Sequence, residues 1–221
     1  MPIALTPKTQ FSLAEKIFIS PNDEQLLVEQ NAKGFFNLDL TAARPTPQAT
    51  ASAAVTFEKW QVLSAKIKTR LSTKYKVAPE FIKVATDSAS LWSPDERRFL
   101  YAQSVGKSLE YHVYDTTDPL GVGEKQNYTV LRVEKTSHTQ VAWYADSKHL
   151  ILTTCSEENK QQTCLSGNLR IIRLDGTNNV QIYAGALSST DVFPTPDGTK
   201  ILILTSFNQI AKPNLYAIIL R

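Results

Sequence analysis

Short apolar runs rich in β-branched and aromatic residues follow one another along most of the chain, and residues typical of turns separate them. Four phrases share one pattern of strand, tight turn and second strand: ISPNDEQLLVEQ from Ile19, WSPDERRFLYAQ from Trp92, WYADSKHLILTT from Trp143 and PTPDGTKILILT from Pro194. Runs of strand length bounded by Pro, Asp, Asn and Gly predict β-hairpins. The chain is therefore expected to be all-β and built from repeated units.

The turn residues of these phrases give the period of the repeat. They are separated by 73, 51 and 51 residues, and they are Asn22, Asp95, Asp146 and Asp197. Repetition at about this period is typical of a propeller or another repeat array. We expect a single β-propeller domain over residues 1–221, with four recognisable blades near 11–40, 87–135, 138–186 and 189–221. Residues 1–8 are expected to close the last blade, which lacks its outer strand.

The repeated turn residues are predicted to be structural. The side chains of Asn22, Asp95, Asp146 and Asp197 can accept hydrogen bonds from backbone N–H groups two residues further on. A role as metal ligands or acid–base groups is disfavoured, because residues that recur once per blade lie a blade apart. By the same argument, Trp92 and Trp143 are expected to pack between blades rather than to form a ligand platform.

The first interval is longer because it carries an insertion, residues 41–86. The insertion opens with TAARPTPQATASAAVT, which is poor in bulky apolar residues and typical of an irregular connection. Thr56 is a suitable N-cap for a helix whose apolar side chains recur at helical spacing, at Phe57, Trp60, Leu63, Ile67 and Leu71. Pro79 then allows a short second helical segment. We expect an amphipathic helix that docks on the propeller.

Charge is distributed unevenly along the chain. The formal net charge is +3, yet the insertion alone carries eight Lys or Arg and two acidic residues, and the remainder is weakly acidic. The basic residues are expected on the face opposite the apolar stripe, and they are Lys59, Lys66, Lys68, Arg70, Lys74 and Lys76. They form either a solvated face or a contact, through residues 56–76, for an anionic membrane or polymer surface. The weakly acidic charge of the residues outside the insertion argues against a nucleic-acid partner.

The two cysteines bear on the compartment of the protein. Cys155 and Cys164 flank the loop SEENKQQT between two predicted strands, so a disulfide is favoured over two unrelated thiols. A disulfide would point outside the cytosol. The chain as given has neither the apolar segment of a signal peptide nor a run long enough to span a membrane, which fits a cytosolic protein or an excised soluble part.

Familiar catalytic motifs are absent from the sequence, including the G-x-S-x-G elbow, the Walker A loop, H-E-x-x-H and the EF-hand. His112, His138 and His149 share no ligand spacing and are expected to pack on strands or to lie at the surface. Asp115 and Asp118 form a lone D-x-x-D, which offers too few oxygen ligands for calcium and is interpreted as a turn. We expect no catalytic residue, no cofactor and no metal site.

The elements SPDE, PDG and NLYAI give the chain a family resemblance. It resembles the WD40-like, TolB-type β-propeller repeats; three of the four units carry the S/T-P-D/N core, and the third departs from it at Tyr144-Ala145-Asp146. PEFIKVATDSASLWSPDERRFLYA and VFPTPDGTKILILTSFN look like the propeller region of bacterial envelope proteins that often carry an N-terminal membrane anchor and a PEGA domain. The resemblance covers roughly residues 11–221. It implies an extracytoplasmic, non-enzymatic propeller that binds a protein or an envelope component and is anchored in the full-length protein.

Three functions remain open at this point. The first is a binding module, and the second is a propeller-type hydrolase or lyase whose site is assembled from loop residues of different blades. Clustering of His112, His149 or Asp118 with a strongly shifted carboxyl would favour that enzyme. The third is a structural subunit that docks through the insertion helix.

Overall fold

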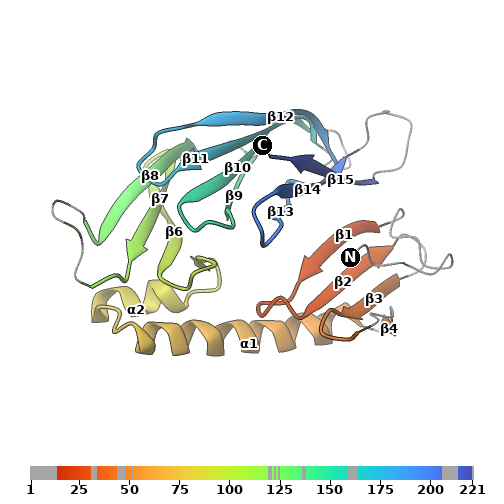
Figure 1. Cartoon of the computed structure of the whole chain (residues 1–221), viewed down its shortest axis with the longest axis horizontal. Helices are drawn as coiled ribbons and strands as arrows, with labels where there is room; N and C mark the ends of the chain where they lie inside the picture. Colours follow the sequence, from red (N-terminus) through yellow and green to blue (C-terminus); the bar gives the residue numbers. More distant parts are fainter. Residues whose placement is uncertain are drawn as a thin grey trace.

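The structure is a computed structural model that describes residues 14–30, 34–43, 48–50, 52–118, 121, 123, 125–135, 138–158, 164–205 and 214–220. These residues form four antiparallel sheets and two helices, so the fold is mostly β. The chain follows a circuit in Figure 1, from the first sheet at the lower right, along α1 to the second sheet at the left, then through the third sheet at the top to the fourth sheet above the first.

Each sheet is an open antiparallel meander whose strands pair in chain order. The first contains β1 (Ala14–Ile19), β2 (Gln25–Gln30), β3 (Gly34–Asp39) and β4 (Gln48–Thr50). The second contains β5 (Leu91–Trp92), β6 (Arg98–Val105), β7 (Ser108–Asp115) and β8 (Asn127–Glu134). The third contains β9 (His138–Trp143), β10 (His149–Glu158), β11 (Cys164–Arg173) and β12 (Val180–Leu187). The fourth contains β13 (Val192–Pro194), β14 (Lys200–Thr205) and β15 (Asn214–Ile219).

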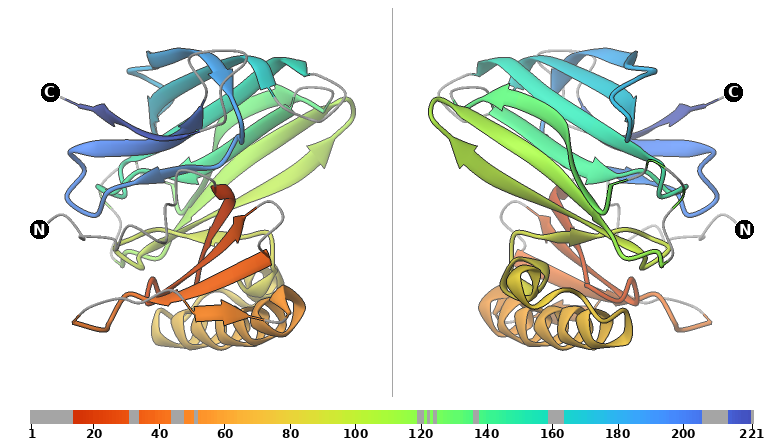
Figure 2. Two further views of the ribbon diagram at one scale, coloured as in Figure 1. Left: turned by 90° about the vertical axis from the view of Figure 1, so that its right-hand side faces the viewer. Right: turned by 90° about the vertical axis from the view of Figure 1, so that its left-hand side faces the viewer.

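Neighbouring sheets share apolar cores because successive strand residues point to opposite faces. In the second sheet, Leu100 pairs with Val113 and both pack against the third sheet, where they join a cluster that contains Trp143 and Leu150. The other face of the third sheet packs on the fourth sheet through a second cluster, to which Leu169, Leu187, Ile201 and Ile203 belong. The second, third and fourth sheets therefore pack face to face, and both views of Figure 2 show them lying above α1.

Helix α1 (Ala53–Lys74) connects the first and second sheets, and α2 (Pro79–Thr86) follows it. Near its start, α1 contacts the first sheet: the Phe57 ring meets Phe18 edge-on at 4.9 Å between centroids, and Trp60 Nε1 donates to Gln25 Oε1 at 3.2 Å. Towards its end, α1 contacts the second unit through Lys68, Arg70 and Lys74. Figure 1 shows the helix running along the base of both sheets.

Helix α2 covers the remaining face of the second sheet. Phe99 and Tyr114 are paired across β6 and β7 and point to this side, where Phe81 of α2 lies 4.8 Å from Tyr114 between ring centroids. Trp92 belongs to the same aromatic cluster and donates from Nε1 to the Ala85 carbonyl at 3.0 Å. Its counterpart Trp143 donates instead to the Leu91 carbonyl at 2.8 Å and so joins the third sheet to the second.

Two features near the start of the insertion differ from what the sequence predicts. Residues 48–50 form the outer strand β4 of the first sheet, whereas the sequence placed them inside the insertion. Helix α1 begins at Ala53 with Ser52 at the N-cap, so the expected start after Thr56 is wrong by about one turn. Ala53 and Ala54 are the strongest helix formers and extend the helix towards β4. The proposed closing strand, residues 1–8, lies outside the described residues.

Cys155 and Cys164 form a disulfide between β10 and β11, with an S–S distance of 2.08 Å and a Cα separation of 5.7 Å. Both side chains are buried in the core between the third and fourth sheets. No helix in the described part of the chain is both long and apolar enough to cross a membrane.

Reduction of this disulfide is expected to lower the free energy of unfolding by about 2–3 kcal/mol, because the bond restricts a short loop in the unfolded chain. Urea unfolding with and without a reducing agent measures the loss. The Cys155→Ala/Cys164→Ala variant is the control, since its unfolding should not respond to the reducing agent. An equal response of both proteins would show that the reducing agent acts elsewhere.

Candidate binding face

The four repeated turns have one backbone geometry. The residue after each turn Asn or Asp has a positive φ, between 58° and 67°, and these residues are Asp23, Glu96, Ser147 and Gly198. In every copy its N–H donates to the carbonyl three residues earlier, on Ser20, Ser93, Tyr144 and Thr195 respectively. The left-handed conformation costs free energy for any residue other than glycine, so hydrogen bonds around the turn have to hold it.

The turn carboxylates supply those hydrogen bonds. Oδ1 accepts the N–H two residues further on at 3.0 Å from Arg97 to Asp95, at 2.9 Å from Lys148 to Asp146 and at 3.0 Å from Thr199 to Asp197. In the first turn Ser20 Oγ donates to Asn22 Oδ1 at 2.8 Å and accepts the Gln25 N–H at 2.9 Å. Asp95, Asp146 and Asp197 therefore accept the backbone N–H that the sequence predicts, whereas Asn22 accepts the Ser20 hydroxyl within its turn.

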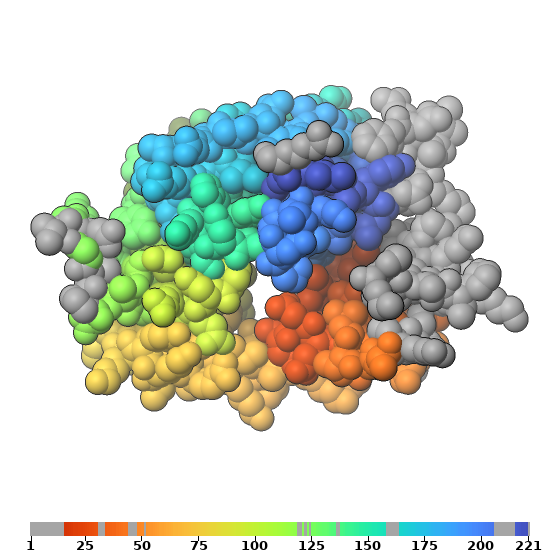
Figure 3. All heavy atoms as spheres, viewed as in Figure 1, coloured from red at the N-terminus to blue at the C-terminus, as the bar shows by residue number. Residues whose placement is uncertain are grey.

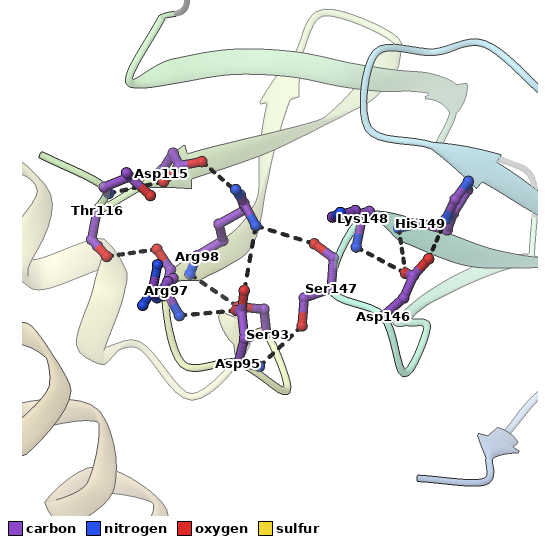
Figure 4. Close-up of polar contacts among 11 residues, drawn as sticks. Ser93, Asp95, Arg97, Arg98, Asp115, Thr116, Asp146, Ser147, Lys148 and His149 are labelled. Carbon is purple, nitrogen blue, oxygen red and sulfur yellow. Dashed lines mark hydrogen bonds and ion pairs between the residues drawn. The ribbon is translucent and has the colours of Figure 1, made fainter. Parts of the chain in front are cut away.

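The second, third and fourth turns also touch one another, and we call these three turns, residues 93–98, 144–149 and 195–200, the turn face. Figure 4 shows that the second and third turns are joined at Ser147, whose Oγ accepts the Asp95 N–H at 3.0 Å. Tyr144 of the third turn donates its hydroxyl to the Gly198 carbonyl of the fourth. Bonds between consecutive turns fix the spacing of the sheets at this end.

Arg98 is the centre of the junction in Figure 4. Its Nε lies 2.6 Å from Asp115 Oδ2, and its Nη1 lies 3.5 Å from Asp95 Oδ2 and 3.4 Å from the Ser147 carbonyl. Asp115 also accepts the Thr117 N–H at 2.9 Å. The sequence did not single out Arg98 or Ser147. The only sequence signal was that both lie in repeated turns, because their partners Asp115 and the neighbouring turn lie 17 or more residues away along the chain.

Asp115 and Asp118 are not brought together as a cation site. Asp115 is buried and paired with Arg98, whereas Asp118 lines a separate cavity. Across the described residues, no group of three or more His, Cys, Asp and Glu side chains is placed to hold a metal ion.

The three histidines lie apart. His149 Nδ1 is 2.6 Å from Asp146 Oδ2 inside the third turn, and His138 begins β9 with an exposed side chain. His112 stacks on Tyr101 at 5.2 Å between ring centroids. Its Nε2 is 3.4 Å from Glu110 Oε2, which is an ion pair only when the ring is protonated; otherwise that buried nitrogen has no hydrogen bond. No interaction among described residues joins His112, His149 and Asp118.

The basic residues of the insertion do not form one free surface. Lys68 is buried, not on the outer face, and this corrects the prediction; its Nζ donates to the carbonyls of Asp87 at 2.6 Å and Ser88 at 3.0 Å. Burial lowers the pKa of Lys68, and the Asp87 charge opposes that effect. Arg70 and Lys74 both pair with Glu96 at 3.2 Å.

The remaining insertion lysines are exposed. Lys59 and Lys66 lie on the outer face of α1, near Val55 and Val62, which are 51% and 57% exposed. Lys76 follows the helix and lines a cavity of about 690 Å³ between the end of α1 and the second sheet. Lys74, which is paired with Glu96, lines the same cavity, and the cavity lies beside the second turn.

Asp197 is predicted to make the turn face sensitive to strong acid. The hydrogen bond from Thr195, and then those from Thr199, lower the pKa of the Asp197 carboxyl from 3.8 to about 2. Because the folded-state pKa lies below the unfolded value, this carboxylate stabilises the fold above pH 3.8, and the contribution is lost as the pH falls from 3.8 to about 2.

An NMR titration of the side-chain carboxyl checks this. We expect Asp197 to titrate near pH 2 in the native chain and closer to its usual value in Thr195→Val, which lacks the strongest hydrogen bond. Titration at the same pH in both proteins would mean that the threonine does not hold the carboxylate.

No protein-family model matches the sequence, and no curated protein matches it. Among solved structures, it is similar to TolB from Acinetobacter baumannii, with 12% identity and a TM-score of 0.42, over 91% of this chain and 37% of that one. It is also similar to a putative TolB from Agrobacterium tumefaciens, with 12% identity and a TM-score of 0.38, over 90% of this chain and 62% of that one.

A third similar structure is an enzyme, the oligogalacturonate lyase from Vibrio parahaemolyticus, with 11% identity and a TM-score of 0.40, over 93% of this chain and 50% of that one. The chain thus spans less than two thirds of the length of each of these proteins.

Proposed function

We propose that this chain is a non-catalytic binding scaffold of the propeller type, with the four sheets as its blades. The observation that carries the proposal is the turn face. Its carboxylates bond within their own turns, and its turns bond to one another, so these residues build a rigid platform. The shared cores between the second, third and fourth sheets support the division into blades near 11–40, 87–135, 138–186 and 189–221, with the helical insertion 41–86 between the first two.

We place the protein outside the cytoplasm, in a bacterial cell envelope and anchored there in its full-length form. The disulfide between Cys155 and Cys164 supports this location, because structural disulfides persist in oxidising compartments. The proposed partner is a protein or an envelope component. Contact with an anionic surface would use Lys59 and Lys66, since Lys68, Arg70 and Lys74 bond within the chain.

A second candidate function is a structural subunit that docks through α1. The exposed side chains of Val55 and Val62 on the outer face of the helix favour it, because apolar side chains on an outer helix face are a common docking surface. The enzyme alternative would need His112, His149 or Asp118 in one cleft, and these residues contact different neighbours.

Capture from a bacterial envelope fraction tests the scaffold proposal. The immobilised chain is compared with Lys59→Glu/Lys66→Glu and with Val55→Ser/Val62→Ser, and bound material is quantified at increasing load. Saturable capture that the charge reversal abolishes supports the anionic contact, and loss in the serine variant alone supports docking through α1. Steady release of altered envelope material over time, without saturable capture, would contradict the scaffold and favour the enzyme.

A further inference from the structure

The cavity beside the second turn brings together basic side chains from segments far apart in the sequence. It is formed by the end of α1, the second turn and the described residues 116–118 and 126 after β7. Arg97 and Thr116 of its wall are labelled in Figure 4. Its described lining comprises Lys74, Tyr75, Lys76, Arg97, Thr116, Thr117, Asp118 and Gln126. At about 690 Å³ it is within the size range of small-molecule sites, roughly 300–1,000 Å³.

Positive charge exceeds negative charge around this cavity. Glu96 already pairs with both Arg70 and Lys74, so that group of three keeps one surplus positive charge. No ion pair or hydrogen bond within the described residues engages the ammonium of Lys76 or the guanidinium of Arg97. Among the described lining residues, Asp118 is the one acidic side chain. The described wall of the cavity therefore carries a surplus of positive charge.

Lys76 occupies a position that favours another residue. The N–H of Lys76 bonds the Thr73 carbonyl at 3.2 Å and the N–H of Val77 bonds the Ser72 carbonyl at 3.0 Å, which is the Schellman ending of a helix. Lys76 has φ +49°, in the left-handed region where glycine is preferred. A lysine there costs stability and places an ammonium in the wall of the cavity.

The other groups of the wall suit an oxygen-rich anion. The Arg97 guanidinium offers several N–H donors in one plane, Gln126 offers an amide group and Thr117 offers a hydroxyl. The Tyr75 ring does not present a free face, because Trp92 stacks 6.4 Å from it and Lys74 Nζ lies 4.7 Å from its centroid. Recognition would therefore depend on charge and hydrogen bonds rather than on stacking.

From this arrangement we propose that the cavity binds a phosphomonoester group, held by Lys76 and Arg97, while Lys74 stays paired with Glu96 and only adds to the positive charge of the wall. Such a group carries about −1.5 to −2 charges at neutral pH, which matches the surplus of positive charge on the wall. The cavity is larger than one phosphate, so the group would be attached to a small polar body, either a soluble phosphorylated compound or a lipid headgroup. The inference deepens the proposed binding function by naming the ligand chemistry at one place.

Phosphate titration of the full chain tests the inference, with inorganic phosphate as the probe and NMR shifts as the signal. Lys76→Asn keeps a residue that tolerates the left-handed conformation, and it should weaken binding at least about fivefold, the loss that corresponds to roughly 1 kcal/mol of Coulomb attraction at a wet surface. Asp118→Asn should strengthen binding by a similar factor. Lys59→Gln, which removes the same charge from the outer face of α1, should leave binding unchanged.

Stability measurements separate the ligand role from folding. Lys76→Gly should raise the melting temperature by about 2 °C, because glycine relieves the backbone conformation, while it weakens phosphate binding as Lys76→Asn does. An equal loss in Lys76→Asn and Lys59→Gln would overturn the inference, because it would show attraction by net charge alone. Absence of saturable binding in the native chain would overturn it as well.

Two further binding experiments distinguish a soluble phosphorylated compound from a lipid headgroup. One uses glycerol 3-phosphate, and the other uses phosphatidylcholine vesicles with and without phosphatidic acid. Binding in either arm that Lys76→Asn weakens supports the site and identifies the source, and binding in neither contradicts the inference. Envelope capture by Lys76→Asn is measured in parallel. Intact capture with no phosphate binding would remove this inference and leave the scaffold proposal standing.

Discussion

Replacement of Arg98 by alanine is expected to lower the free energy of unfolding by about 3 kcal/mol. The guanidinium bonds the Asp115 carboxylate at 2.6 Å, and the Asp115 side chain is only 9% exposed. Without Arg98 this carboxylate keeps the Thr117 N–H but loses its opposite charge, so a poorly solvated charge remains in the fold. The variant also loses the contact with Ser147 that joins the second turn to the third. Urea unfolding measures the change.

A double-mutant cycle provides the control. Asp115→Asn combined with Arg98→Ala should recover part of the loss, because an amide is less costly to bury than an unpaired carboxylate. Arg98→Lys should fall between the native chain and Arg98→Ala, since it keeps the charge but not the fork of donors. A loss below about 1 kcal/mol in Arg98→Ala would mean that the pair behaves like a surface ion pair.

Replacement of Trp60 by alanine is expected to cost about 3–5 kcal/mol, the usual cost of deleting a buried aromatic side chain. Trp60 is 7% exposed, meets the Phe57 ring edge-on at 5.9 Å between centroids and donates to Gln25 of the first sheet. Its loss therefore leaves a cavity and an unpaired amide oxygen at the contact between α1 and the first sheet. Chemical unfolding gives the magnitude, and hydrogen exchange of the α1 amides shows whether the helix is released locally.

Val62→Ala is the matched control on the same helix. Val62 is 57% exposed, so its truncation should change the free energy of unfolding by less than about 0.5 kcal/mol. Similar small effects of both substitutions would contradict the structure, because α1 would then not depend on its contact with the first sheet.

The contacts between the sheets and with α1 explain why Arg98 and Trp60 are expected to matter for stability. The second, third and fourth sheets share cores and turn contacts, whereas α1 contacts both the first sheet and the second unit. Figure 3 shows a gap in the surface above α1, between the first sheet and the segments coloured yellow and blue. The insertion is therefore part of the scaffold, and its deletion would be expected to damage the fold rather than to remove an accessory.

Local features could be predicted from the sequence because neighbouring residues determine them. Pro, Asp and Asn between apolar runs identified the four turns, and the helical spacing of Phe57, Trp60 and Leu71 identified the packed stripe of α1. The start of α1 was wrong by a turn, since a suitable N-cap at Thr56 does not show that two preceding alanines extend the helix. The strand β4 was missed because it is short and bounded by prolines on its N-terminal side.

The sequence by itself determined the repeat, the mostly β class, the turn chemistry and the presence of a basic amphipathic helix, because periodicity and turn preferences act over a few residues. Only the tertiary structure decided that Lys68 is buried, since its acceptors are carbonyls nineteen and twenty residues away. It alone also decided that Arg98 joins two turns and that Lys76 and Arg97 line one cavity. A charged residue favours water unless distant segments supply partners, and no pattern of neighbouring residues specifies which segments will meet it.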